Sequence, residues 1–194
     1  MKRFLLSFLT LLLLIPITAR AEEKSADYTI EFSSESSDGT ADLKNTTYSK
    51  YTTDSGSIIN SAEFSKVYSG KSGLKFGSSS ANGSLTFTLK NAIDVDYVVI
   101  SATAYSSDAS PSFKFNDSST ATTITGSDLT ISNVGSISTI KIEGSASAKA
   151  NYRFYLKSIT IYLRSAETGG DESAAAVTPT ISVANNYSSD VELG

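Results

Sequence analysis

The tripeptide Gly70-Lys71-Ser72 has the residue types that end a phosphate-binding loop. Such a loop also needs a glycine five residues before Gly70 and, after the tripeptide, a helix whose amide groups point at the phosphates. The chain instead has Ser65 at that position, and Leu74-Lys75-Phe76 alternates apolar and polar residues as a β-strand does. The sequence therefore predicts a turn between two strands here and argues against a nucleotide site of this kind.

Histidine and cysteine are both absent from the chain. A Ser-His-Asp triad, a Cys-His pair, an imidazole-bound zinc ion and a disulfide are therefore excluded. A glycosidase would need two carboxyl groups that face each other across a cleft, whereas Asp94 and Asp96 are neighbours on the same side of one strand end. We expect a protein that is not an enzyme. The formal net charge of −4 and the lack of a basic cluster also argue against nucleic acid or an anionic membrane as a partner.

Acidic side chains in predicted turns offer the oxygen ligands that calcium prefers. None of them belongs to the spaced loop of a recognised calcium motif. Two interpretations stay open, solvated turn carboxylates or ligands of a structural calcium ion, and no other cofactor is expected. The residues concerned are Asp94, Asp96, Asp108, Asp117 and Asp128.

The N-terminus has the pattern of an export signal. Lys2 and Arg3 precede an apolar run over residues 4–17, and Ala19-Arg20-Ala21 places small residues at the two positions that a signal peptidase recognises. The run is shorter than the ~20 apolar residues of a membrane-spanning helix. We therefore expect a signal peptide over residues 1–21, no membrane span after its removal, and a secreted or cell-surface location. Removal takes away three basic residues and changes the formal net charge from −4 to −7.

Alternation of apolar and polar residues predicts many short strands over residues 22–164. Segment 84–90 is apolar on one face only, whereas 96–105 has apolar or small residues on both faces and is typical of a central strand. Glycine, asparagine and aspartate separate the strands. The predicted fold is all-β, a jelly-roll-like antiparallel β-sandwich that forms one domain. Further strands are expected at 28–32, 43–48, 58–68, 73–77, 112–115, 120–124, 128–132, 137–142 and 151–163.

The last predicted strand changes phase along its length. Tyr152, Phe154 and Leu156 occupy even positions, whereas Ile159 and Ile161 occupy odd ones. A strand that serves both runs needs one extra residue between them, so the sequence predicts a β-bulge at 157–158.

The composition changes abruptly after residue 164. Segment 165–179 is small, acidic and rich in glycine and alanine, which predicts a flexible linker. Segment 180–194 then begins with the alternation of a strand. It is either a disordered tail or the first strand of a further β module.

The predicted loops suggest where a ligand would bind. If every strand pair is antiparallel, each connection switches ends of the sandwich, and counting the strands places loops 49–57, 78–83, 106–111, 125–127 and 143–151 at one end. Loops on a rigid sandwich commonly carry binding sites. Aromatic rings beside amide and carboxylate groups suit a sugar, which has an apolar face and a rim of hydroxyl groups. The candidate ligand-binding residues are Tyr51, Asp54, Asn82, Tyr105, Asp108 and Tyr152.

A family resemblance rests on three stretches of the chain: KSGLKFGSSSANGSLTFTL, VDYVVISATAYSSDASPSFKFN and YRFYLKSITIYL. The chain resembles, over about residues 28–164, secreted β-sandwich modules of multidomain surface proteins of Gram-negative anaerobes, which are similar in outline to galactose-binding-like and carbohydrate-binding jelly rolls. The resemblance implies a module that accompanies other domains in a larger protein. Export, the all-β frame, the loop cluster and the linker together predict a monomeric, non-catalytic module that binds glycan or supports adhesion. A structural spacer without a ligand of its own is the alternative.

The export signal generates the first testable prediction. Protein recovered from the native host should begin at Glu22, because Ala19 and Ala21 frame the only good cleavage site. N-terminal sequencing or intact-mass measurement checks this. A mature protein that retains Met1 would contradict it.

Overall fold

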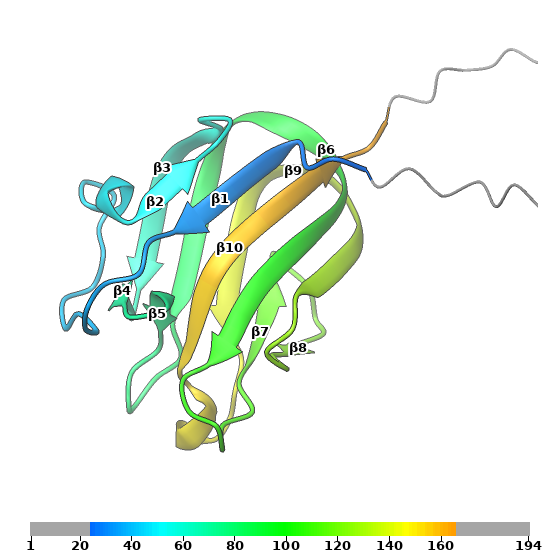
Figure 1. Ribbon diagram of the computed structural model, residues 1–194. Helices are drawn as coiled ribbons and strands as arrows, with labels where there is room; N and C mark the ends of the chain where they lie inside the picture. Colours follow the sequence, from blue (N-terminus) through cyan, green and yellow to red (C-terminus); the bar gives the residue numbers. More distant parts are fainter. Residues whose placement is uncertain (1–23, 166–194) are drawn as a thin grey trace, which may run out of the picture. The chain divides into compact units, whose positions relative to one another are not determined.

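The computed structural model describes residues 24–165, which form an all-β unit of antiparallel strands (Figure 1). The predicted signal peptide, and the linker and tail beyond residue 165, lie outside the described residues. The strands are β1 (Tyr28–Phe32), β2 (Thr52–Asp54), β3 (Ile59–Ser65), β4 (Val67–Gly70), β5 (Gly73–Phe76), β6 (Ser84–Ala104), β7 (Ser112–Phe115), β8 (Thr122–Thr123), β9 (Leu129–Gly144) and β10 (Phe154–Leu163). Two short 3-10 helices, η1 (Tyr48–Lys50) and η2 (Lys149–Asn151), lie in connections.

The strands form two layers that share β6 and β9. The front layer, nearer the viewer in Figure 1, has the strand order β2-β1-β10-β6-β9. It contains the second half of β6 and the first half of β9. β5 pairs with the start of β10 and β4 pairs with β5, so these two strands extend the same layer. The back layer contains β3, the first half of β6, the second half of β9, β7 and β8. The fold is therefore the β-sandwich that the sequence predicts.

Bulges let β6 and β9 bend from one layer into the other. Their pairing register shifts between Thr88 and Ile93 and again between Val95 and Tyr97. In β9 the bend contains a left-handed residue, Gly135, with a φ of 78°. Extra residues of this kind bend a strand, and strands that change sheets make the corners of a sandwich.

Several strand predictions need correction. The predicted strands 84–90 and 96–105 belong to one strand, β6. Likewise, 128–132 and 137–142 belong to one strand, β9. In both cases the hydrogen-bonded pairing continues on either side of the bend, so the bend does not end the strand. Segment 43–48, predicted as a strand, forms turns that lead into η1.

Other local predictions are confirmed. The register between β10 and β6 shifts between Leu156 and Ser158, which is the predicted bulge. Gly70 and Gly73 pair across the hairpin of β4 and β5, so the Gly-Lys-Ser tripeptide lies in a turn. One prediction in this region is wrong: segment 58–68 is not a single strand but is broken at Lys66, whose φ of 53° separates β3 from β4.

The core lies between the layers and consists of aliphatic and phenylalanine side chains. The rings of Phe76 and Phe154 stack with centroids 4.7 Å apart, and Phe113 packs against Phe154 at 6.3 Å. Among the described residues no polar or charged residue is fully buried. Stability therefore comes from apolar burial, as expected for a chain without disulfides.

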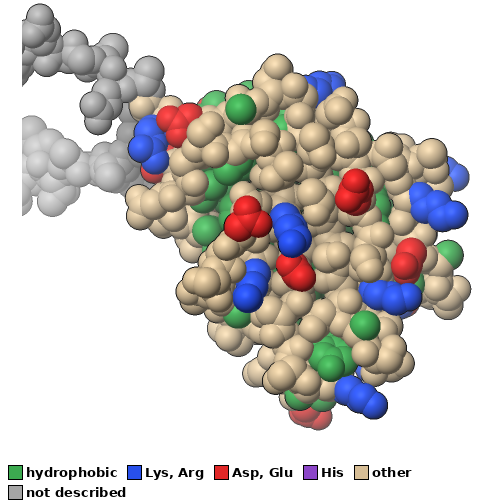
Figure 2. All heavy atoms as spheres, turned by 180° about the vertical axis from the view of Figure 1, so that it is seen from behind, with side chains coloured by type: hydrophobic (Ala, Val, Ile, Leu, Met, Phe, Trp, Pro, Cys, Tyr) green, Lys and Arg blue, Asp and Glu red, His purple; other side chains and the backbone are tan. Residues whose placement is uncertain are grey.

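The outer faces of the two layers differ. Figure 2 shows the molecule from behind, where Lys and Arg side chains are interspersed with Asp and Glu. The back layer carries an ion pair of this kind, Lys141 with Glu143, at 2.8 Å. The front layer carries the hydroxyl and tyrosine side chains described below, with the exposed Glu31 of β1 beside Ser158.

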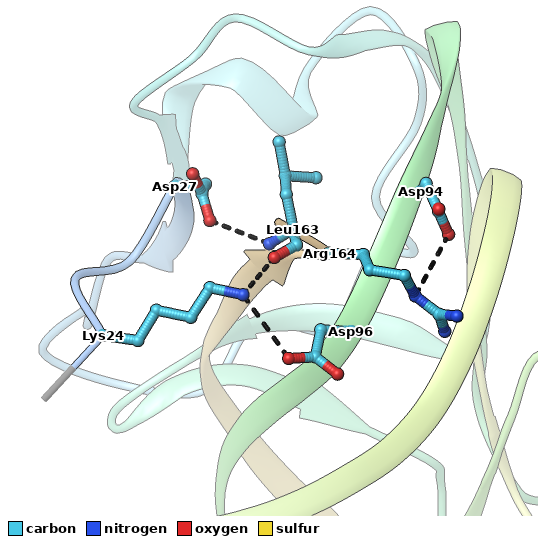
Figure 3. Close-up of polar contacts among 6 residues, drawn as sticks. All are labelled: Lys24, Asp27, Asp94, Asp96, Leu163 and Arg164. Carbon is cyan, nitrogen blue, oxygen red and sulfur yellow. Dashed lines mark hydrogen bonds and ion pairs between the residues drawn. The ribbon is translucent and has the colours of Figure 1, made fainter. Parts of the chain in front are cut away.

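Polar contacts join the two ends of the described unit (Figure 3). The Asp27 carboxylate accepts a hydrogen bond from the Leu163 amide at 2.8 Å, and the Nε atom of Arg164 lies 3.8 Å from the Asp94 carboxylate. The Arg164 amide also donates to the Asp94 carbonyl at 2.9 Å. Lys24 contacts Asp96 at 3.4 Å. β10 runs away from this point for ten residues, roughly 30 Å of extended chain, so the loops before Phe154 lie at the opposite end of the sandwich.

Two glycines with similar backbone angles provide a matched test of this packing. Gly77 and Gly135 have φ of 75° and 78°, but a Cβ at Gly77 would overlap the carbonyl oxygen of Tyr152, whereas one at Gly135 would meet open space. Gly135→Ala should therefore lower the free energy of unfolding by about 1–2 kcal/mol through backbone strain alone. Gly77→Ala should lower it by at least about 2 kcal/mol more, or prevent folding. Urea unfolding of both variants checks this, and equal losses would contradict the described packing.

Candidate functional site

The outer face of the front layer carries a continuous row of tyrosine and hydroxyl side chains, called here the tyrosine face. Register pairs Tyr162 with Tyr97, Thr160 with Val99, Ser158 with Ser101 and Tyr155 with Thr103. The neighbouring inward positions, such as Ile100 and Ile159, are fully buried. The tyrosine face follows from period-two alternation on both strands, with the bulge of β10 keeping the two halves in phase. Its members are Tyr97, Val99, Ser101, Thr103, Tyr105, Tyr155, Ser158, Thr160 and Tyr162.

One end of the tyrosine face is a stacked ring pair. Tyr97 and Tyr162 lie with centroids 4.2 Å apart and planes inclined by 14°. Both side chains are half-buried, and the ammonium group of Lys24 lies 6.0 Å from the centre of the Tyr97 ring. The pair offers a broad apolar surface at the end where the described unit begins and ends.

The other end combines rings with a guanidinium group. Tyr105, directly after β6, stacks on Tyr155 with centroids 5.5 Å apart. The Arg153 guanidinium lies 4.1 Å from the centre of the Tyr105 ring, a cation–π contact. Tyr97 and Tyr105 are eight residues apart, so the tyrosine face extends for about 26 Å along the strand.

A loop around Asp38 folds over this end and is anchored by Tyr155. The Tyr155 hydroxyl donates to the Asp38 carboxylate, with both oxygens at 3.1 Å, and the Lys71 amide donates to the same group at 3.1 Å. Burial, together with the hydrogen bond to and charge of Asp38, raises the pKa of Tyr155 well above its ordinary value. Tyr155 therefore stays protonated and holds the loop.

Lys75 ties the same loop to β5. Its ammonium group donates to the Gly39 carbonyl at 2.9 Å, lies 3.9 Å from the Asp38 carboxylate and stands 4.7 Å from the centre of the Tyr68 ring. The side chains of Lys75 and Asp38 are only 14% and 16% exposed, so this contact is screened less than a surface ion pair.

Between the Asp38 loop and the start of β10 lies a cleft of about 250 Å³, called here the cationic cleft. Two of its walls carry positive charge, Lys75 and Arg153, and the described residues that line it include no carboxylate. The Nε atom of Arg153 is buried without a hydrogen-bond partner. The cleft is lined by Thr40, Tyr68, Lys75, Ser78, Ser79 and Arg153, together with two glycines.

Three of the candidate residues predicted from the sequence meet at the end of the sandwich that carries the cationic cleft. Asn82 donates to the Ala146 carbonyl at 2.9 Å, and the Tyr152 hydroxyl donates to the Ser147 carbonyl at 3.4 Å. Tyr105 forms the ring contacts described above. The exposed Asp108 follows Tyr105 by three residues and accepts a hydrogen bond from Ser107 at 3.3 Å.

Tyr51 and Asp54 lie elsewhere, which corrects the expected grouping of loops. Asp54 pairs with Ile30 at the outer strand of the front layer, and its carboxylate accepts from the Ile59 amide at 2.9 Å. Tyr51 lines a second cleft of about 450 Å³ formed with residues 39–44, which shares Gly39 and Thr40 with the cationic cleft. The loop count failed at 49–57 because segment 43–48 is not a strand, and because this stretch contains the end of η1 and the strand β2 instead of one loop.

Sequence reasoning did not name the tyrosine pair Tyr97 and Tyr162 as site residues. At the other end of the face it missed Asp38, Lys75, Arg153 and Tyr155. Only the spacing of Arg153 and Tyr155, two apart on one strand face, was visible in the sequence. Asp38 and Lys75 join them through pairing between distant segments, which local pattern does not reveal.

The described residues contain no group of three or more acidic side chains that could hold a metal ion. Asp94 and Asp96, two of the aspartates considered for calcium, contact Arg164 and Lys24. Within residues 24–165 no helix has the length and hydropathy needed to cross a membrane. Comparison with protein-family models, curated proteins and solved structures finds no match for the chain.

The raised pKa of Tyr155 generates a prediction about alkaline stability. In the unfolded chain the Tyr155 hydroxyl releases its proton near pH 10, whereas in the folded protein it keeps that proton. The stabilisation that Tyr155 contributes is therefore complete below pH 10 and is lost as the pH rises above it. Tyr155→Phe should therefore show a smaller loss of unfolding free energy above pH 10 than the wild type. Asp38→Asn should give an intermediate slope, because burial remains the larger cause of the shift. Urea unfolding across this range checks the order, and identical slopes would contradict it.

Proposed function

We propose that the protein is a non-catalytic, exported module that binds glycan through the tyrosine face and the cationic cleft beside it. The observation that carries the proposal is the composition of this one outer face, where tyrosine rings mark both ends of a row of small hydroxyl side chains. The back layer has mixed charges instead.

This chemistry suits a sugar. A pyranose ring presents C–H groups on one face and hydroxyls around its rim, so it is matched by an aromatic ring beside hydrogen-bonding groups. Ser101, Ser158 and Thr160 are half-buried hydroxyl residues that each offer a donor and an acceptor. Their short side chains lose little conformational entropy when a ligand immobilises them.

The position of the site supports recognition of a large ligand. A face about 26 Å long accommodates several sugar rings in a row. The cationic cleft lies at the end of the sandwich opposite the contacts of Lys24, Asp27 and Arg164. Both ends of the described unit therefore lie far from the cleft.

The two tyrosine pairs allow a direct test. The full chain should bind at least one glycan on an array, and Tyr105→Ala and Tyr162→Ala should each weaken that binding about threefold to tenfold through loss of ring contact. Tyr51→Ala removes a ring that lies outside the tyrosine face and does not line the cationic cleft, so it should leave affinity unchanged and serves as the matched control. Isothermal titration measures affinity, and circular dichroism shows that each variant is folded.

Two results would contradict this assignment. Binding that survives both variants but is lost in Tyr51→Ala would move the site to the cleft formed with residues 39–44. A folded chain that binds no glycan at all would favour the structural spacer.

A further inference from the structure

The cationic cleft contains a positive charge that no carboxylate neutralises. Within the described part of the chain Arg153 forms no ion pair, although its side chain is half-buried and its Nε atom is fully buried without a hydrogen-bond partner. The carboxylate that anchors the loop over this end, Asp38, is already engaged by the Tyr155 hydroxyl, the Lys71 amide and Lys75.

An arrangement of this kind is unfavourable for the protein alone. Buried donors are normally paired, and a partly desolvated cation without a counter-charge destabilises the folded state. The contact of Arg153 with Tyr105 compensates for only part of this loss, since a cation–π interaction neutralises no charge. The positive potential at Lys75 and Arg153 therefore points to an anionic group outside the chain.

We propose that the cationic cleft binds a single anionic substituent, a carboxylate or a sulfate ester, of an acidic glycan. The inference rests on the proposed glycan-binding function and names the class of sugar. Lys75 supplies a point charge and Arg153 a planar guanidinium, a combination suited to an oxyanion. Thr40, Ser78 and Ser79 add hydroxyl groups to the rim of the cleft.

The charge of the whole chain limits the kind of acidic ligand. The formal net charge is −4, so a densely charged polyanion is repelled by most of the surface. A glycan with one anionic group in the cleft and neutral rings along the tyrosine face avoids this repulsion. The size of the cleft, about 250 Å³, suits one substituted sugar rather than a chain.

The test uses the full chain and three matched oligosaccharides of galactose: a neutral one, one whose terminal sugar is galacturonic acid, and one with a terminal sulfate ester. At least one acidic oligosaccharide should bind about tenfold or more tightly than the neutral one, and added salt should reduce the difference. The carboxylate and sulfate arms identify which anion is preferred.

Ser79 provides a variant that removes no existing contact of Lys75 or Arg153. Ser79 is exposed at the rim of the cleft, so Ser79→Asp places a negative charge where the anion would enter. It should abolish the preference for the acidic oligosaccharide, whereas Ser79→Asn, of equal size and neutral, should retain it. Thr88→Asp, exposed on the back layer, controls for the change in net charge.

The outcomes separate the two proposals. Equal affinity for acidic and neutral oligosaccharides overturns the anion site and leaves glycan binding intact. A preference that survives Ser79→Asp also overturns the anion site. A folded chain that binds none of the three, nor any glycan on an array, overturns both.

Discussion

The pairing of β6 with β9 is the constraint on which the remaining structure depends. Both strands run through both layers and stay paired on either side of the bend, so the two layers are one sheet folded on itself. Each neighbouring strand then adds to one half of this framework: β10 to the front half of β6 and β3 to the back half. Without the bulges near Ile93 and Tyr97 the ladder would continue straight and leave the apolar faces of both halves in water.

β10 converts this framework into a site. Its bulge at Lys157 changes the phase of alternation, so that Leu156 and Ile159, three residues apart, both point into the core. The same change of phase keeps Tyr155 and Thr160 together on the outer face. A regular strand would turn one of these halves over and expose buried residues, at a free-energy loss of about 1.5–3 kcal/mol for each large side chain. The core thus enforces the geometry of the tyrosine face.

Local pattern was sufficient for some of this and not for the rest. The all-β class, the turn at 70–73 and the bulge at 157 follow from alternation and glycine positions, which are properties of neighbouring residues. The bends of β6 and β9 could not be predicted in this way. A polar segment such as Asn91 to Asp94 has the same composition whether it ends a strand or bends one. The site residues Lys75 and Arg153 are 78 positions apart and meet only through the pairing of β5 with β10, which a single sequence leaves open.

Hydrogen bonds within the free protein hold the walls of the cleft in place. The bond from Tyr155 to the Asp38 carboxylate, of a charge-assisted kind worth about 1.5–3 kcal/mol, holds one wall of the cleft, and Lys75 fixes the same wall through Gly39. Ordering of a loop during binding would otherwise subtract from affinity. The unpaired guanidinium of Arg153 acts in the opposite direction, since it lowers the stability of the free protein. Both features act before any binding: the charges are arranged during folding, so an anion bound as proposed would meet a partner that is already held in place and partly desolvated.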